Sequence, residues 1–237
     1  MRAAPALAGT IAVLVGGLAG FYGYRHYAAR RHAPLSPATA PAPGASAGAP
    51  GATADGSRPV LKVPDTLPEV HLAGLDGRKH ALAEFAHRPL IVNFWATWCE
   101  PCRREIPLLT TLRSAYAGDH LEIVGIAIDF RDSVDAFLKK TPLPYPLLIG
   151  EEDGIDAAAA FGMQVVLPFS VFVDEQNRIV AVKVGELHRD EADAILGTMR
   201  AVRAGQLELT AARARIAEKL KAIATERALH PATAGGV

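Results

Sequence analysis

Two cysteines separated by two residues, Cys99 and Cys102, stand where an apolar segment gives way to a helical pattern. Residues 90–95 read Leu-Ile-Val-Asn-Phe-Trp, which is typical of a central strand, and residues 100–116 carry apolar side chains at helical spacing. Cys99 therefore falls at a helix N-terminus, where unpaired N–H groups and the helix dipole favour an anion. We expect a thiol pKa below the free value of ~8.5 and assign Cys99 as the attacking thiolate.

Cys102 follows one helical turn later on the same face, close enough to Cys99 for a disulfide. We expect it to be the more buried of the two and to act as the resolving thiol, which releases a mixed disulfide formed at Cys99. Pro101 between them presets φ near the start of the helix. Trp98, directly before Cys99, is expected to shape the docking surface, whereas Trp95 reads as core.

The cysteine pair has two other interpretations. A metal site needs four ligands, but the chain has no further cysteine and its eight histidines show no ligand spacing. A static structural disulfide fits poorly with the strand-to-helix junction, the flanking tryptophans and the intervening proline. We therefore expect no metal and no cofactor beyond the redox-active Cys99–Cys102 disulfide.

The order of the expected elements indicates an α/β fold, a mixed sheet with helices on both faces, within a chain long enough for one or two domains. The last helix has one narrow apolar stripe; it either docks on its own domain or offers a face for a partner or self-association. Thr210 is its expected N-cap, and Pro107 predicts a kink in the first helix. The expected segments are a hairpin from 69–73 and 78–82, strands 90–95, 121–129, 146–149, 169–173 and 179–184, and helices 100–116, 134–140, 155–161, 190–203 and 208–229.

The N-terminal residues 1–32 read as a membrane anchor. Residues 3–24 carry no charge, and a transmembrane helix of about residues 5–24 fits the bilayer. A cleaved signal peptide is the alternative, but arginines and histidines follow the apolar run at once instead of a small-residue cleavage site. Residues 33–59 are rich in Ala, Pro and Gly with almost no large apolar side chain, so they should form a disordered tether.

The string Phe-Trp-Ala-Thr-Trp-Cys-Glu-Pro-Cys-Arg-Arg-Glu, residues 94–105, resembles the thioredoxin superfamily, and specifically its membrane-tethered TlpA/ResA-like thiol–disulfide oxidoreductases. The resemblance covers about residues 60–205 and implies a thioredoxin fold for them, with residues 206–237 as an additional C-terminal helix and tail. The Glu100–Pro101 dipeptide is that of the ResA-like members. Glu105 matches their active-site glutamate, which is implicated in tuning the cysteines.

Pro168 matches the cis-proline that packs against the disulfide in the family, with Leu167 before it. The resemblance implies that this loop presents a backbone edge to the substrate peptide beside Cys99. The neighbours of Pro168 differ from the commoner Thr-Thr, which leaves peptide specificity open.

Asn93 stands where ordinary thioredoxins carry a buried Asp. Asn cannot ionise, so Glu105 becomes the candidate proton carrier. The alternative is that Glu105 is a solvated helix carboxylate or an ion pair with Arg103 or Arg104.

Two lines of reasoning on topology disagree. Arg25, Arg30 and Arg31 follow the apolar run, whereas Arg2 and the amino terminus precede it, and this count favours a cytoplasmic domain by a small margin. The anchored family members work outside the cytoplasmic membrane. We follow the resemblance and expect a single-pass inner-membrane protein with its thioredoxin-like domain in the periplasm, where the absence of stray cysteines suits oxidising surroundings.

The leading functional hypothesis is a reductase of disulfides in exported proteins, recharged by a membrane thiol electron donor. The resemblance suggests apocytochrome c as one substrate, in cytochrome c maturation. Alternatives are a disulfide oxidase or isomerase, a peroxiredoxin-like peroxidase and a non-catalytic membrane scaffold. A formal net charge of zero argues against a nucleic-acid partner.

Overall fold

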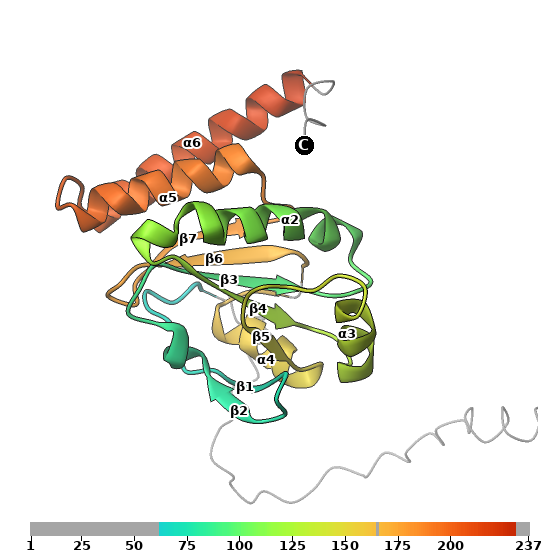
Figure 1. The fold of residues 1–237 in the computed structure, drawn as a ribbon. Helices are drawn as coiled ribbons and strands as arrows, with labels where there is room; N and C mark the ends of the chain where they lie inside the picture. Colours follow the sequence, from blue (N-terminus) through green and yellow to red (C-terminus); the bar gives the residue numbers. More distant parts are fainter. Residues whose placement is uncertain (1–61, 165, 231–237) are drawn as a thin grey trace, which may run out of the picture. The chain divides into compact units, whose positions relative to one another are not determined.

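The computed structural model describes residues 62–164 and 166–230 (Figure 1). The expected anchor over residues 1–32 and the expected tether over residues 33–59 lie outside these residues. Within the described part of the chain, no helix combines the length and the apolar character needed to cross a membrane.

One seven-stranded mixed sheet forms the centre of the described fold, in the order β2-β1-β5-β4-β3-β6-β7. β4 lies in the middle of this order. Its neighbour β3 is parallel to β4 and antiparallel to β6, and β6 and β7 form the expected second hairpin. The expected first hairpin is also present, as β1 and β2. The strands are β1 His71–Gly74, β2 Lys79–Ala81, β3 Leu90–Trp95, β4 Glu122–Ala127, β5 Leu147–Ile149, β6 Phe169–Val173 and β7 Ile179–Val184.

Helices cover both faces of this sheet, as the sequence predicts (Figure 1). Two of them begin earlier than expected, because the first turns of α3 and α4 are polar and show no apolar periodicity. Thr210 is not an N-cap: Glu208 takes that position in α6, without a capping side-chain hydrogen bond. The helices are α2 Glu100–Ala115, α3 Arg131–Leu138, α4 Glu152–Ala160, α5 Arg189–Arg203 and α6 Leu209–Leu229, with short 3-10 turns at Leu82–Phe85 and Ala117–Asp119.

Alternating residues of β3 divide between two buried clusters. Ile91 and Trp95 join the cluster that contains α2, α3, α5 and α6 side chains. Phe94, on the opposite face, packs with α4 and stacks on Phe169 at a centroid distance of 4.2 Å. Because side chains alternate along a strand, Asn93 shares the face of Ile91 and Trp95 and is directed toward α2. An amide thus sits in an otherwise apolar row.

α6 docks on its own domain, which is the first of the two alternatives that the sequence left open for this helix. Ala212 and Ile216 are buried against the cluster beneath α5. The Arg213 guanidinium donates to the Ile179 carbonyl at 2.7 Å, and Arg227 pairs with Asp190 at 3.0 Å. These contacts join the last strand, β7, and α5 to the C-terminal helix.

Candidate functional site

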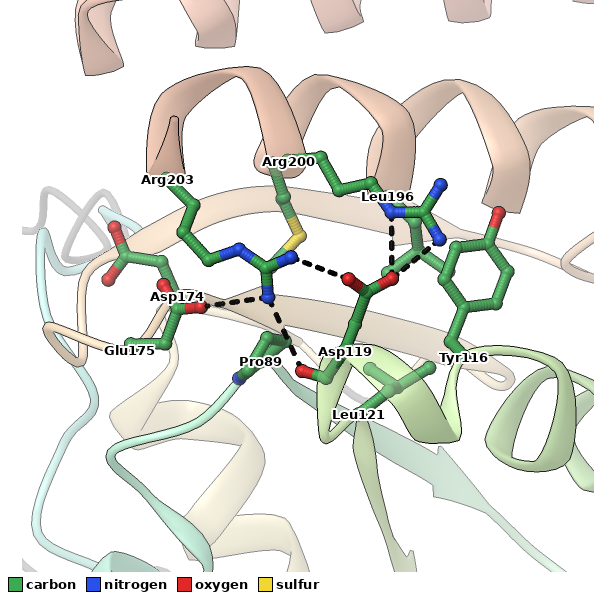
Figure 2. Close-up of a pocket in the computed structure, with 10 residues that line it drawn as sticks. Pro89, Tyr116, Asp119, Leu121, Asp174, Glu175, Leu196, Arg200 and Arg203 are labelled. Atoms are coloured by element: carbon green, nitrogen blue, oxygen red, sulfur yellow. Dashed lines mark hydrogen bonds and ion pairs between the residues drawn. The ribbon is translucent and has the colours of Figure 1, made fainter. Parts of the chain in front are cut away.

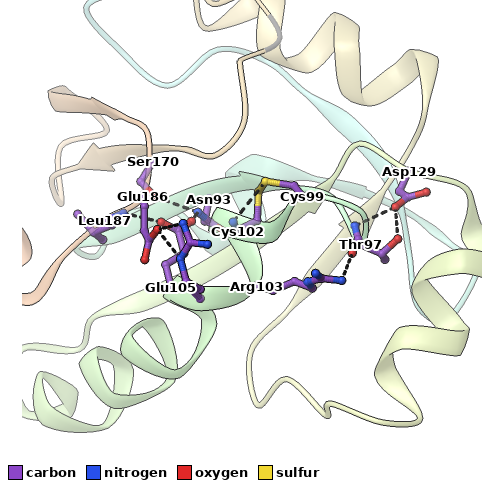
Figure 3. The surroundings of a disulfide bond; sticks show 11 residues. Asn93, Thr97, Cys99, Cys102, Arg103, Glu105, Asp129, Ser170, Glu186 and Leu187 are labelled. Carbon is purple, nitrogen blue, oxygen red and sulfur yellow. Dashed lines mark hydrogen bonds and ion pairs between the residues drawn. A yellow bond between two sulfur atoms is a disulfide. The ribbon is translucent and has the colours of Figure 1, made fainter. Parts of the chain in front are cut away.

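The two cysteines form a disulfide at the start of α2, with their Cα atoms 5.3 Å apart (Figure 3). Cys99 is the N-cap residue of the helix, and its Sγ accepts a hydrogen bond from the Cys102 N–H at 3.3 Å. Cys99 is 5% exposed and Cys102 is completely buried, so the order of burial is the expected one. The sulfur of Cys99 is therefore the one within reach of a substrate and of the free N–H groups that stabilise a thiolate.

Asp129 fixes the turn that leads into Cys99. Its Oδ2 accepts hydrogen bonds from the Thr97 N–H at 2.9 Å and the Thr97 hydroxyl at 2.6 Å, and its Oδ1 accepts one from the Phe130 N–H at 2.8 Å. The sequence interpretation missed this residue. A signal was available, because Asp129 and Thr97 each follow one of two parallel neighbouring strands, whose carboxyl ends meet at one edge of the sheet.

The residues flanking the cysteines lie as follows. Trp98 is 67% exposed beside Cys99, while Trp95 is buried in the core. Glu100 is exposed and pairs with Arg104 at 3.1 Å. Pro101 occupies the first turn of α2, where a missing N–H costs nothing because no helical acceptor exists there. Trp98 thus presents a large apolar side chain at the surface next to Cys99.

The Leu167–Pro168 peptide bond is cis, and we call these two residues the cis-proline loop. Pro168 is buried, and its carbonyl accepts a hydrogen bond from the Gly185 N–H at 2.8 Å. Leu167 packs against the cluster that holds both cysteines. Among the described residues, neither the N–H nor the C=O of Leu167 has a hydrogen-bond partner, so this residue offers the open backbone edge that an extended peptide can pair with.

Glu105 is 2% exposed and its carboxyl lies in a network of donors (Figure 3). Asn93 Nδ2 donates to Oε1 at 2.7 Å and the Leu187 N–H donates to Oε2 at 2.6 Å. Burial raises the pKa of Glu105 to about 7, against the opposing effect of these two hydrogen bonds. The alternative of a solvated or ion-paired carboxylate is wrong: the neighbouring Arg104 pairs with Glu186 instead.

This raised pKa makes the fold less stable as the pH rises. Glu105 binds its proton more tightly in the folded chain, with a pKa of about 7, than at its ordinary value of 4.5. The contribution of Glu105 to stability is therefore fully present below about pH 4.5 and is lost as the pH rises to about 7, a change of about 3 kcal/mol. Denaturant unfolding across this range should show the decline in the wild type and lose that component in Glu105→Gln; parallel curves would contradict the assignment.

A hollow lies near the start of β3, at the opposite end of that strand from the cysteines (Figure 2). Its cavity of about 20 Å³ holds about one water. Arg200 and Arg203 both pair with Asp119, and the Arg200 guanidinium lies 4.7 Å from the centroid of the Tyr116 ring. These charges pair with one another, so the residues that line the hollow connect α5 to the turn before β4, away from the cysteines.

Within residues 62–164 and 166–230, no cluster of three His, Cys, Asp or Glu side chains could hold a metal.

Comparisons with known proteins give one consistent result. Residues 62–196 match the Redoxin family. A thiol-disulfide oxidoreductase ResA from Geobacillus thermodenitrificans is 28% identical over 130 residues, covering 54% of this chain and 73% of that protein. The thioredoxin-like protein YneN from Bacillus subtilis is 32% identical over 130 residues, covering 53% of this chain and 74% of that protein. A solved DsbF homologue from Corynebacterium diphtheriae has a TM-score of 0.50 and 25% identity, covering 56% of this chain and 85% of that one.

Proposed function

The chain belongs to the Redoxin family and is a thioredoxin-like thiol–disulfide oxidoreductase, and from this premise we propose that it reduces disulfides of exported proteins from a membrane-tethered position. The observation that carries the proposal is the buried carboxyl of Glu105, which follows the buried Cys102 by one turn on the same face of α2. This pairing supplies a proton acceptor for the thiol that must resolve the mixed disulfide.

The reaction proceeds in two exchanges. The Cys99 thiolate attacks one sulfur of a substrate disulfide; a Cys99–substrate S–S bond forms and the other substrate sulfur leaves as a thiolate. Cys102 then loses its proton to Glu105, and its sulfur attacks the Cys99 sulfur, releasing the second substrate thiolate. Two electrons pass to the substrate, and the Cys99–Cys102 disulfide is the product. A dithiol donor returns the two electrons and is itself oxidised to a disulfide.

Burial and charge favour the reducing direction. A pair whose reduced, thiolate-containing form is stabilised is oxidising, and the converse also holds. Here Cys102 is completely buried, and Glu105 adds a negative charge near it when ionised. Both features disfavour a thiolate at Cys102, and so they oppose the stabilisation that the N-terminus of α2 gives to the Cys99 thiolate. They support a pair that donates electrons.

The reduction potential tests the direction of electron flow. Equilibration of the full-length chain in detergent against glutathione or dithiothreitol should give a value near or below that of thioredoxin, about −270 mV. A value near −120 mV, typical of a strong periplasmic oxidant, would overturn the reductase proposal in favour of a disulfide oxidase. Cys99→Ser serves as the control for background thiol exchange.

The tether, the compartment and the substrate are further parts of the proposal. The charge-free residues 3–24 and the Ala/Pro/Gly-rich residues 33–59 support a membrane anchor with a domain held off the inner membrane. The family resemblance supports a periplasmic domain, a membrane thiol donor, and apocytochrome c as a substrate during cytochrome c maturation. The open backbone edge at Leu167 and the exposed Trp98 suit an unfolded polypeptide of that kind.

A further inference from the structure

A polar row crosses three neighbouring strands beneath α2. Asn93 of β3 is the register partner of Ser170 of β6, and Ser170 is the register partner of Lys183 of β7. Directly paired residues of adjacent strands direct their side chains to the same face. Asn93 Nδ2 also donates to the Ser170 hydroxyl at 3.0 Å. Lys183 therefore stands at the outer end of the row whose inner end holds Glu105.

The Lys183 ammonium group caps the turn at the end of β7, residues 184–187. It donates to the carbonyls of Val184 and Glu186 at 3.0 Å each, and the Gly185 carbonyl lies at 3.5 Å. The side chain is 15% exposed, and Nζ lies 3.5 Å from the buried Glu191 carboxylate. The ammonium group has three N–H donors, and most of its hydrogen bonds thus go to the backbone carbonyls of this one turn.

The turn 184–187 contacts both working parts of the site. Its Gly185 N–H donates to the Pro168 carbonyl at 2.8 Å, and its Leu187 N–H donates to Glu105 Oε2 at 2.6 Å. Gly185 has a φ of +82°, a backbone conformation that L side chains rarely adopt. The hydrogen bonds from Lys183 fix the turn in the conformation in which these two N–H groups point toward the Pro168 carbonyl and Glu105 Oε2.

We propose that Lys183 is a positioning residue of the redox site: its ammonium group holds the turn 184–187 against the Glu105 carboxyl and the cis-proline loop. The proposal rests on the proposed function, in which Glu105 takes the proton of Cys102. The contacts of Lys183 Nζ among the described residues are with the turn and with Glu191, so it acts through the turn and through its positive charge.

Loss of this lysine changes the environment of Glu105 in one direction. The ionised carboxylate loses the attraction of Lys183, and it loses the Leu187 N–H if the turn relaxes; both contributions lower the pKa of Glu105 in the wild type. The other charged or titratable groups that face Glu105, Lys183 or the turn are Glu186, Glu191, His188, Tyr145, Arg104 and Arg227.

The test follows the Glu105 carboxyl directly, by ¹³C NMR titration of the oxidised full-length chain labelled in glutamate, with Glu105→Gln identifying the resonance. Lys183→Met should move the Glu105 midpoint upward by about one pH unit, the size expected for one lost hydrogen bond to a charged group. Lys183→Arg should keep the wild-type midpoint, and Lys221→Met on the exposed face of α6 serves as the matched control. Amide exchange at Gly185 and Leu187 should quicken only in Lys183→Met.

An unchanged midpoint in Lys183→Met, or an equal shift in Lys183→Arg, would overturn the positioning role. If Lys183→Met does not fold, Lys183→Ala carries the same test, because it also removes both the N–H donors and the charge; an upward shift of the Glu105 midpoint supports the proposal and no shift overturns it. Failure of the proposed function looks different: Glu105→Gln would then keep wild-type turnover and pH dependence, whatever the lysine variants do.

Discussion

Replacing Cys102 with serine is expected to abolish turnover and to leave Cys99 covalently bound to substrate protein. Cys99 keeps its place at the N-terminus of α2, so it still attacks a disulfide and forms the mixed disulfide. No second thiol is then available to resolve it, because the chain has no other cysteine. Non-reducing electrophoresis of membranes from cells that express the full-length variant should show adducts that disappear on reduction.

Two variants separate this trapping from nonspecific thiol oxidation. Cys99→Ser should give no adducts with exported substrates, because the remaining Cys102 is completely buried. The double variant should give none at all. Adducts on Cys99→Ser as abundant as on Cys102→Ser would contradict the assignment of attacking and resolving roles. Adducts absent from membranes but present in the soluble fraction would contradict the proposed tether.

Replacing Glu105 with glutamine is expected to lower turnover near pH 7 by about a hundredfold or more, the usual contribution of a positioned general base. A carboxyl with a pKa of about 7 is ionised in half of the molecules at that pH and can take a proton from Cys102. Glutamine fills the same volume but cannot accept the proton. The pH profile of disulfide reduction should therefore lose its inflection near pH 7 in the variant.

The matched control is Glu152→Gln, which removes an exposed carboxylate on α4, far along the chain from the cysteines. It should keep the wild-type profile. If Glu105→Gln retains both the rate and the inflection, the proton acceptor of Cys102 is another group. A uniform loss of rate at every pH, with the inflection preserved, would instead indicate a packing role for Glu105.

Local patterns were sufficient to predict much of the fold. The apolar run of β3, the helical spacing of α2 and the two hairpins each have a signature within a few residues, and the structure confirms them. The starts of α3 and α4 were missed because their first turns are polar, and periodicity begins only at the first buried residue, such as Val134. The Thr210 cap failed because side-chain type alone does not set where a helix begins.

From residue chemistry alone, the site was predictable only where the reactive groups are also close in sequence; Leu167 and Pro168 were placed by the family resemblance instead. Cys99, Cys102 and Glu105 follow one another along one helix, so spacing places them together. The partners that set the properties of Glu105 come from elsewhere: Asn93 lies on β3, and Leu187 contributes only a backbone N–H, which leaves no trace in residue type. Lys183 joins them through strand register, which a single sequence does not reveal.

The way α6 lies on β7 bears on solubility. β7 is an edge strand, and unpaired edge backbone invites pairing between molecules. At its first residue, Ile179, both backbone groups are occupied: the N–H by the Asp65 carbonyl and the C=O by Arg213 of α6. A domain truncated after residue 205, where the family resemblance ends, would lose Arg213 and leave the Ile179 carbonyl of the edge strand without this donor. The C-terminal helix thus shields this part of the sheet edge from pairing with another molecule.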